Sequence, residues 1–262
     1  MPLQSGLRNL TNSFFYSKSQ CVLYWLIFKN IIYKTFKLLT NELFLRMKFF
    51  NLHTHKFTNN TTVLELVNQY PWEFNDEIPY YSIGIHPWHI NENRLQLDLK
   101  IIEEKLQLKE CLALGECGLD KRIEIPLETQ IAVFEKQIVL AEKYQKPLVL
   151  HLVSAYQEVI EIKNRLKISV PIVVHGFSKN EQVANDLIKN GFYISFGKYL
   201  ILNQEMEQVF KSIPNDRFFL ETDTINESLE EVYQVAAKYK NIKIEDVIEI
   251  VNSNFNIVFK LD

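Results

Sequence analysis

Short apolar runs alternate with longer amphipathic stretches along the chain from Lys48 onward. This alternation is typical of βα units built around a parallel sheet. It predicts seven strands, at residues 49–53, 80–85, 111–115, 147–152, 172–175, 192–195 and 218–221. It also predicts helices between them, at residues 97–108, 127–144, 155–166, 180–189 and 204–212.

The helical period is clearest after Leu127, where Ile131, Phe134, Ile138 and Ala141 recur on one face and indicate core packing. Beyond the last predicted strand the pattern is entirely helical, with helices expected at residues 228–239, 244–251 and 254–259. The fold class is therefore α/β. A (β/α) TIM-type barrel with seven clear strands, the eighth short or missing, is favoured over an open doubly wound sheet.

The first 46 residues differ from the rest of the chain. Their apolar block, residues 21–28, is too short to span a bilayer, and lysines follow it from Lys29. We expect residues 1–46 to be a dispensable extension or a mis-assigned start, with translation beginning at Met47 and the barrel occupying residues 47–262. The alternative is a membrane-surface or partner-binding helix with an apolar face of Ile31, Ile32, Phe36, Leu38 and Leu39.

Charge and cysteine content narrow the function classes. The net charge is −3, but residues 47–262 carry 23 basic and 31 acidic side chains. A negative body argues against a large sequence-reading nucleic-acid surface, although a local basic groove or a bound cation can still handle phosphate. Three irregularly spaced cysteines form neither a disulfide framework nor a zinc pattern, which favours the cytoplasm. No stable membrane association and no protein partner are expected.

Histidines and carboxylates gather at the predicted strand ends. His53 and His55 lie two residues apart in a strand, so their side chains point to the same face. Glu116 and Asp223 also follow apolar strands, and active sites of barrels occupy the C-terminal rim of the sheet. The other four histidines of the chain each lie at or just past the end of an apolar run: His86, His89, His151 and His175.

This residue set suits divalent cations. Imidazole nitrogens and carboxylate oxygens are ligands of such ions, and the candidates are His53, His55, Glu116, His151, His175 and Asp223. Six groups are more than one ion needs, which indicates two ions about 3.5 to 4 Å apart that share a carboxylate. Such ions bring the pKa of a water molecule to near 7, and Asp223 could orient that water or accept its proton.

Six stretches in a fixed order carry a family resemblance. They are Asn51-x-His53-x-His55, Gly84-x-His86-Pro87, Gly115-Glu116-Cys117-Gly118-Leu119-Asp120, His151, His175-Gly-Phe-Ser178 and Leu220-Glu221-Thr222-Asp223. With them, residues 48 to about 259 resemble the TatD family of metal-dependent deoxyribonucleases, within the wider amidohydrolase-like barrels.

The resemblance implies a barrel that binds one or two divalent ions (Mg²⁺, Mn²⁺ or Zn²⁺) and hydrolyses phosphodiester bonds from DNA ends. Glu116 and Asp223 would be the catalytic residues. One metal site would contain Glu116 with His53, His55 and Asp223, and Glu116 would bridge to a second site containing His151 and His175.

The chain also departs from the family pattern. Asn51 stands where the family usually has Asp, and no basic residue follows His151. Trp88 stands where many members carry a second histidine, and an aromatic ring there could stack on a base. We expect Trp88 and His86 to contact the substrate, although His86 could instead orient a ligand or be structural.

Neighbouring polar residues receive simpler interpretations. We expect Cys117 to be a buried thiol that faces away from the metals, Asp120 to cap the following helix or hold the loop, and His89 to be a loop residue. Glu221 is either an acceptor beside a ligand or part of a structural ion pair. The leading hypothesis is a deoxyribonuclease. The alternatives are a hydrolase of the same fold acting on a small ester, amide or other non-DNA substrate, and a non-catalytic metal-binding protein.

Overall fold

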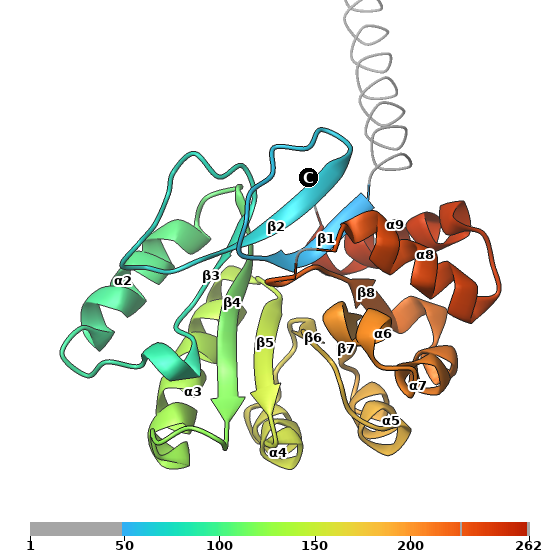
Figure 1. Cartoon of the computed structure of the whole chain (residues 1–262). Helices are drawn as coiled ribbons and strands as arrows, with labels where there is room; N and C mark the ends of the chain where they lie inside the picture. The colour runs from blue at the N-terminus through green and yellow to red at the C-terminus, as the bar shows by residue number, and fades with distance from the viewer. Residues whose placement is uncertain (1–48, 226, 261–262) are drawn as a thin grey trace, which may run out of the picture. The chain divides into compact units, whose positions relative to one another are not determined.

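A computed structural model describes residues 49–225 and 227–260, which form an eight-stranded parallel sheet rolled into a nearly closed barrel (Figure 1). The strands lie side by side in sequence order, so the predicted TIM-type barrel is confirmed. They are β1 (Phe49–Thr54), β2 (Val63–Gln69), β3 (Tyr81–Ile83), β4 (Cys111–Asp120), β5 (Leu148–Val153), β6 (Ile172–Val174), β7 (Tyr193–Phe196) and β8 (Phe218–Leu220).

Helices cover the outside of the barrel from β3 onward (Figure 1). Local capping defines several of their ends: the Asn180 side chain accepts the Val183 N–H at the start of α5, and Ser228 and Glu231 form a capping box at α8. The helices are α2 (Leu95–Leu106), α3 (Leu127–Tyr144), α4 (Tyr156–Leu166), α5 (Glu181–Lys189), α6 (Lys198–Leu202), α7 (Met206–Ser212), α8 (Leu229–Lys240) and α9 (Ile244–Phe259), with the 3-10 turns η1 (Pro87–His89) and η2 (Asn215–Arg217).

The prediction of two separate helices at residues 244–251 and 254–259 is wrong, because α9 runs through both. Asn252 and Asn254 place polar side chains in the middle of this helix. Asn254 is nevertheless buried, and its side-chain amide donates to the carbonyl oxygens of Asn215 and Phe218. The polar position therefore serves to attach the last helix to the start of β8.

The expectation of a short or missing eighth strand is also wrong. The additional strand is β2, a full seven residues between the first two predicted strands. Glu65, Asn68 and Gln69 interrupt its apolar run, yet all three are buried. Each takes part in at least one hydrogen bond, although Asn68 Nδ2 is buried without a partner among the described atoms, and the strand forms despite these polar side chains.

Loops replace the expected crossover helices on both sides of β2. Parallel strands are usually joined by a helix, but residues 55–62 and 70–80 contain none. Glu65 accepts hydrogen bonds from the backbone N–H and the hydroxyl of Thr58, at 3.0 and 2.9 Å. Gln69 exchanges two hydrogen bonds with the backbone of Asn75. The two loops are thus held by the strand that they flank.

The barrel closes where β1 meets the segment after β8. Thr54 and Asp223 form a parallel bridge, in which the Asp223 N–H donates to the His53 carbonyl oxygen at 2.9 Å. The Asn51 side chain donates to the Thr222 hydroxyl and accepts the Thr222 N–H. Asn51 therefore links the first strand to the segment that carries Asp223. This junction of β1 with the segment after β8, the seam of the barrel, places the predicted site residues His53 and Asp223 side by side.

Two predictions stand apart from this fold. The proposed extension, residues 1–46, lies outside the described residues. Within residues 49–225 and 227–260, no helix is long and apolar enough to cross a membrane. The cytoplasmic location and the absence of a protein partner stay predictions.

Candidate metal centre

The six predicted ligands converge at the C-terminal rim of the barrel. Three of them lie within β1, β4 and β5, namely His53, Glu116 and His151, and three lie after β1, β6 and β8, namely His55, His175 and Asp223. Five of the six line a cavity of about 510 Å³, and the sixth, His53, lies fully buried behind it. The cavity-lining ligands are His55, Glu116, His151, His175 and Asp223.

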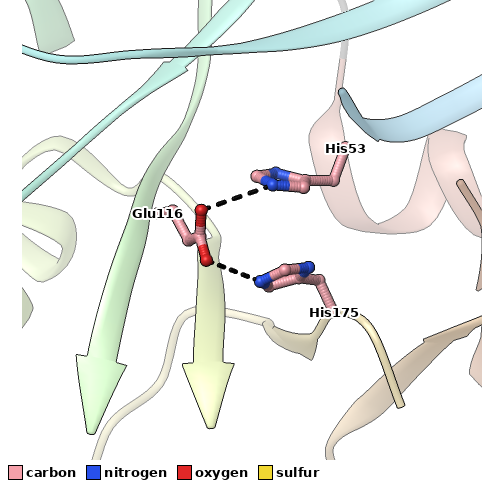
Figure 2. Close-up of side chains that lie close together, drawn as sticks. All are labelled: His53, Glu116 and His175. Carbon is pink, nitrogen blue, oxygen red and sulfur yellow. Dashed lines mark hydrogen bonds and ion pairs between the residues drawn. The ribbon is translucent and has the colours of Figure 1, made fainter. Parts of the chain in front are cut away.

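Glu116 is the centre of the cluster, and its two carboxylate oxygens face different partners. Oε2 lies 3.4 Å from His53 Nε2 and 3.7 Å from His55 Nε2. Oε1 lies 2.7 Å from His175 Nε2 and 3.0 Å from His151 Nδ1. Figure 2 shows the carboxylate between the His53 and His175 rings, with one oxygen directed at each. Glu116 thus divides the histidines into two pairs.

Asp223 belongs to the first pair. Its Oδ1 lies 3.4 Å from His55 Nε2 and 3.7 Å from His53 Nε2. The backbone of Asp223 is in the left-handed region, with φ of 52°, a conformation that Asp tolerates better than most residues. The bridge to Thr54 fixes this turn, so the carboxylate is delivered directly beside the two histidines of β1.

The spacing of these atoms fits divalent cations. Two ligand atoms that each lie about 2.1 Å from one cation are roughly 3.0 to 3.4 Å apart. Three sets of three ligand atoms approach this spacing, with all atoms of a set within 4.8 Å of one another: His53 with Glu116 and His175, His53 with His55 and Asp223, and His86 with Glu116 and His151. His53 is 0% exposed, and neither of its ring nitrogens has a hydrogen-bond partner among the described atoms. A cation bound to Nε2 would give that nitrogen, which faces Glu116 and Asp223, a partner.

His86 lies on the Oε1 side of Glu116, at 3.1 Å from its Nε2. Its Nδ1 accepts the backbone N–H of Trp88 at 3.1 Å, so the neutral ring carries its hydrogen on Nε2 and donates toward Glu116. Burial lowers the pKa of His86, and the hydrogen bond with Glu116 opposes that shift only in part. His86 therefore contacts the ligand cluster and also lines the cavity where a substrate would lie.

Three further polar residues contact the ligands. The Glu221 side chain is fully buried, with Oε1 3.5 Å from His175 Nδ1, a contact that fits either of its two predicted roles. Asn68 accepts the backbone N–H of Glu116 at 2.8 Å. Sequence reasoning missed Asn68 because it missed β2, although the turn residues before Val63 and Pro71 after it bound the run. Asp120 accepts a hydrogen bond from the Arg122 N–H and so holds the loop, as predicted.

Cys117 and His89 lie off the ligand cluster. Cys117 is a fully buried free thiol in contact with the Val149 carbonyl oxygen, so the prediction of a buried thiol is confirmed. His89 ends η1 and packs edge-on against the rings of Tyr70 and Trp72, which makes it part of one cavity wall.

Aromatic and basic side chains line the rest of the cavity. Trp88 is 57% exposed and Tyr199 is 42% exposed, so both present ring surface to a ligand. Arg122, in the loop after β4, and Lys179, after β6, supply positive charge to the same cavity. Sequence reasoning missed both cations, and the available signal was their place just beyond the strand-end motifs.

The Glu116–His175 contact has a clear electrostatic consequence. Burial disfavours the charged carboxylate of Glu116, but the charge of His175 and the histidine hydrogen bonds outweigh it and hold the pKa of Glu116 well below its usual range. Burial likewise disfavours charged His175, yet Glu116 raises the pKa of His175 well above its usual value. At neutral pH and without a cation, a proton is therefore held between these residues.

We expect metal binding to release at least about one proton at pH 7, because a ligand histidine must be neutral. The raised pKa of His175 means that protons compete with the metal, so metal affinity should increase from pH 6 to pH 8. Calorimetric titration with Mn²⁺ in two buffers of different ionisation enthalpy measures the protons released. Equal heats in the two buffers, or affinity that falls as pH rises, would contradict this expectation.

Comparisons with known proteins agree with this geometry. A family model described as "TatD related DNase" matches residues 45–260. The chain is 28% identical over 219 residues to an uncharacterised metal-dependent hydrolase, YabD, of Bacillus subtilis, covering 77% of this chain and 83% of that one. It is 30% identical over 147 residues to a putative deoxyribonuclease of Vairimorpha ceranae, covering 55% of this chain and 51% of that one. Its fold resembles the crystal structure of a TatD homolog of Escherichia coli, with a TM-score of 0.71, 20% identity and coverage of 83% and 100%.

Proposed function

Because the chain belongs to the TatD family of metal-dependent hydrolases, we propose that it is a deoxyribonuclease that cleaves phosphodiester bonds from DNA ends. The observation that carries the proposal is that the two oxygens of Glu116 face different histidines. Glu116 lies at the floor of a cavity whose walls contain both aromatic rings and basic side chains. That combination suits a substrate with bases and phosphates.

Two cations would be held by two sets of ligands that share Glu116. On the Oε2 side the ligands would be His53, His55 and Asp223, and on the Oε1 side they would be His151 and His175. Mg²⁺, Mn²⁺ or Zn²⁺ bound there would stabilise charge on the phosphoryl oxygens and lower the pKa of the attacking water.

The protein's own groups would position and activate the reactants. The Asp223 side chain is 30% exposed and faces the cavity, where it can orient water and accept its proton. Its neighbours His55 and His53 lower the pKa of Asp223 against the opposing effect of burial, so the carboxylate is ionised and able to act as an acceptor at neutral pH.

The cavity walls would hold the nucleic acid. Stacking of a base on an exposed ring such as Trp88 or Tyr199 is worth about 1–3 kcal/mol. Arg122 and Lys179 would contact phosphates, so that positive charge comes from neighbouring loops although no basic residue follows His151. These two basic side chains would provide a local phosphate-binding surface although residues 47–262 carry a net negative charge.

The test is to remove and restore the metal. Chelator-treated protein should release no nucleotides from a linear single-stranded DNA, and Mg²⁺ or Mn²⁺ should restore stepwise release from one end. A covalently closed circular strand of the same sequence should resist, because it has no end. Protein with Asp223→Asn, purified in parallel, controls for contaminating nucleases.

The same screen separates the alternative function. RNA, a generic phosphodiester and small esters and amides are assayed with the same metal-loaded protein. If DNA stays intact while a small ester or amide is hydrolysed, the deoxyribonuclease assignment fails and a hydrolase of the same family with another substrate replaces it.

A further inference from the structure

Asp120 lies next to His151, on the side of the ring opposite Glu116. His151 Nδ1 is 3.0 Å from Glu116 Oε1, and His151 Nε2 is 3.3 Å from Asp120 Oδ2. The Asp120 side chain is buried, and its backbone is fixed by Gln130, which both donates to its carbonyl oxygen and accepts its N–H. Asp120 is therefore a rigid acceptor at the rear of a proposed ligand.

The indole of Trp88 holds the same carboxylate oxygen. Trp88 Nε1 donates to Asp120 Oδ2 at 2.8 Å, while the Arg122 N–H donates to Oδ1 at 2.8 Å. The Trp88 ring also packs at a steep angle against the rings of His86 and His151. Both oxygens of Asp120 are thus engaged, and one of them is shared between Trp88 and His151.

This arrangement determines which nitrogen of His151 is available. An ionised carboxylate can only accept, so the hydrogen between His151 and Asp120 belongs to Nε2. A neutral ring then has its lone pair on Nδ1, directed at Glu116 Oε1. Two electron-rich atoms at this distance repel each other unless a cation lies between them, and a hydrogen-bonded carboxylate behind a histidine increases the basicity of the ligating nitrogen.

We propose that Asp120 and Trp88 are positioning residues for the cation on the Oε1 side of Glu116. Asp120 fixes the tautomer and orientation of His151, and the Trp88 N–H fixes Asp120. The inference rests on the proposed metal-dependent function but not on its DNA substrate. It gives the Trp88 N–H a role that is independent of stacking by the exposed face of the ring.

The experiment titrates Mn²⁺ into metal-free full-length protein by calorimetry, without nucleic acid. Asp120→Asn and Trp88→Phe should each weaken one of the two bound equivalents by about 10- to 100-fold and leave the other unchanged. Trp88→Phe retains an aromatic ring and removes the N–H donor together with the five-membered ring that carries it. Trp72→Phe is the matched control, because Trp72 stacks on Tyr70 away from the ligands, and it should leave both equivalents unchanged.

A second measurement keeps the proposal testable if Asp120→Asn folds poorly. ¹⁵N NMR of histidine side chains in wild-type protein loaded with diamagnetic Zn²⁺ should show His151 with its hydrogen on Nε2, and Trp88→Phe should alter that signal. Unchanged affinity for both equivalents in Trp88→Phe, or His151 with its hydrogen on Nδ1, would overturn the proposal. Failure to cleave DNA would leave these results unaffected, so the two proposals fail separately.

Discussion

Glu116→Gln is expected to lower the hydrolytic rate by about 10³-fold or more and to weaken both metal equivalents. The carboxylate faces His53 and His55 with one oxygen and His151 and His175 with the other, so its loss removes a ligand from both cations. Metal polarisation is worth several kcal/mol in such reactions, and each 1.36 kcal/mol is a factor of ten in rate. Single-turnover hydrolysis and calorimetric Mn²⁺ titration measure the two effects.

The fold should survive this substitution. Without Glu116 the buried His175 loses one of the two carboxylates that raise its pKa, but Glu221 still faces its Nδ1, so no buried charge is left without a partner. Glu207→Gln is the matched control, since that carboxylate is exposed and its ion-pair partner is Lys211, one helical turn away. An active Glu116→Gln protein, or one that keeps one equivalent at full affinity, would refute the bridging assignment.

Asp223→Asn should reduce kcat by about 10² to 10⁴-fold, the usual contribution of a general base. Asn preserves the size of the side chain but neither accepts a proton nor carries the charge that faces His53 and His55. Since Asp223 lies only on the Oε2 side, this variant should weaken one metal equivalent and leave the other intact.

The contrast between the two variants is the informative result. Steady-state kinetics at saturating Mn²⁺ should show kcat falling while KM for DNA changes little. Asp216→Asn, at an exposed position in η2, controls for general effects of removing a carboxylate. Asp223→Asn that loses both equivalents, or that raises KM alone, would contradict the role given to this residue.

The sequence predicts the site better than the wall of the barrel. The six candidate ligands are all recognisable because each lies in or just after an apolar strand, and parallel strands deliver their C-terminal halves to one rim: His53, His55, Glu116, His151, His175 and Asp223. The convergence therefore follows from seven correctly placed strands. Which oxygen of Glu116 faces which histidine depends on side-chain directions that strand periodicity alone does not determine.

The missed features have a common physical cause. Strand β2 is not predicted because polar residues, Glu65, Asn68 and Gln69, interrupt its apolar pattern. Their side chains form hydrogen bonds with the flanking loops and with the backbone of Glu116, and a pattern of hydrophobicity does not reveal such bonds. The support of His151 by Asp120 and Trp88 joins three separate segments, so no local motif reveals it.

The seam of the barrel gives the cation a mechanical role. In the described part of the chain the first and last strands are joined by the Thr54–Asp223 bridge and the Asn51–Thr222 pair. A cation held by His53, His55 and Asp223 would link the first strand to the segment after the last one. Its binding free energy would then add to the stability of the folded barrel. Loss of the ion would then loosen the two ends of the sheet first, and amide hydrogen exchange along β1 and β8 would report that fraying before the rest of the barrel opens.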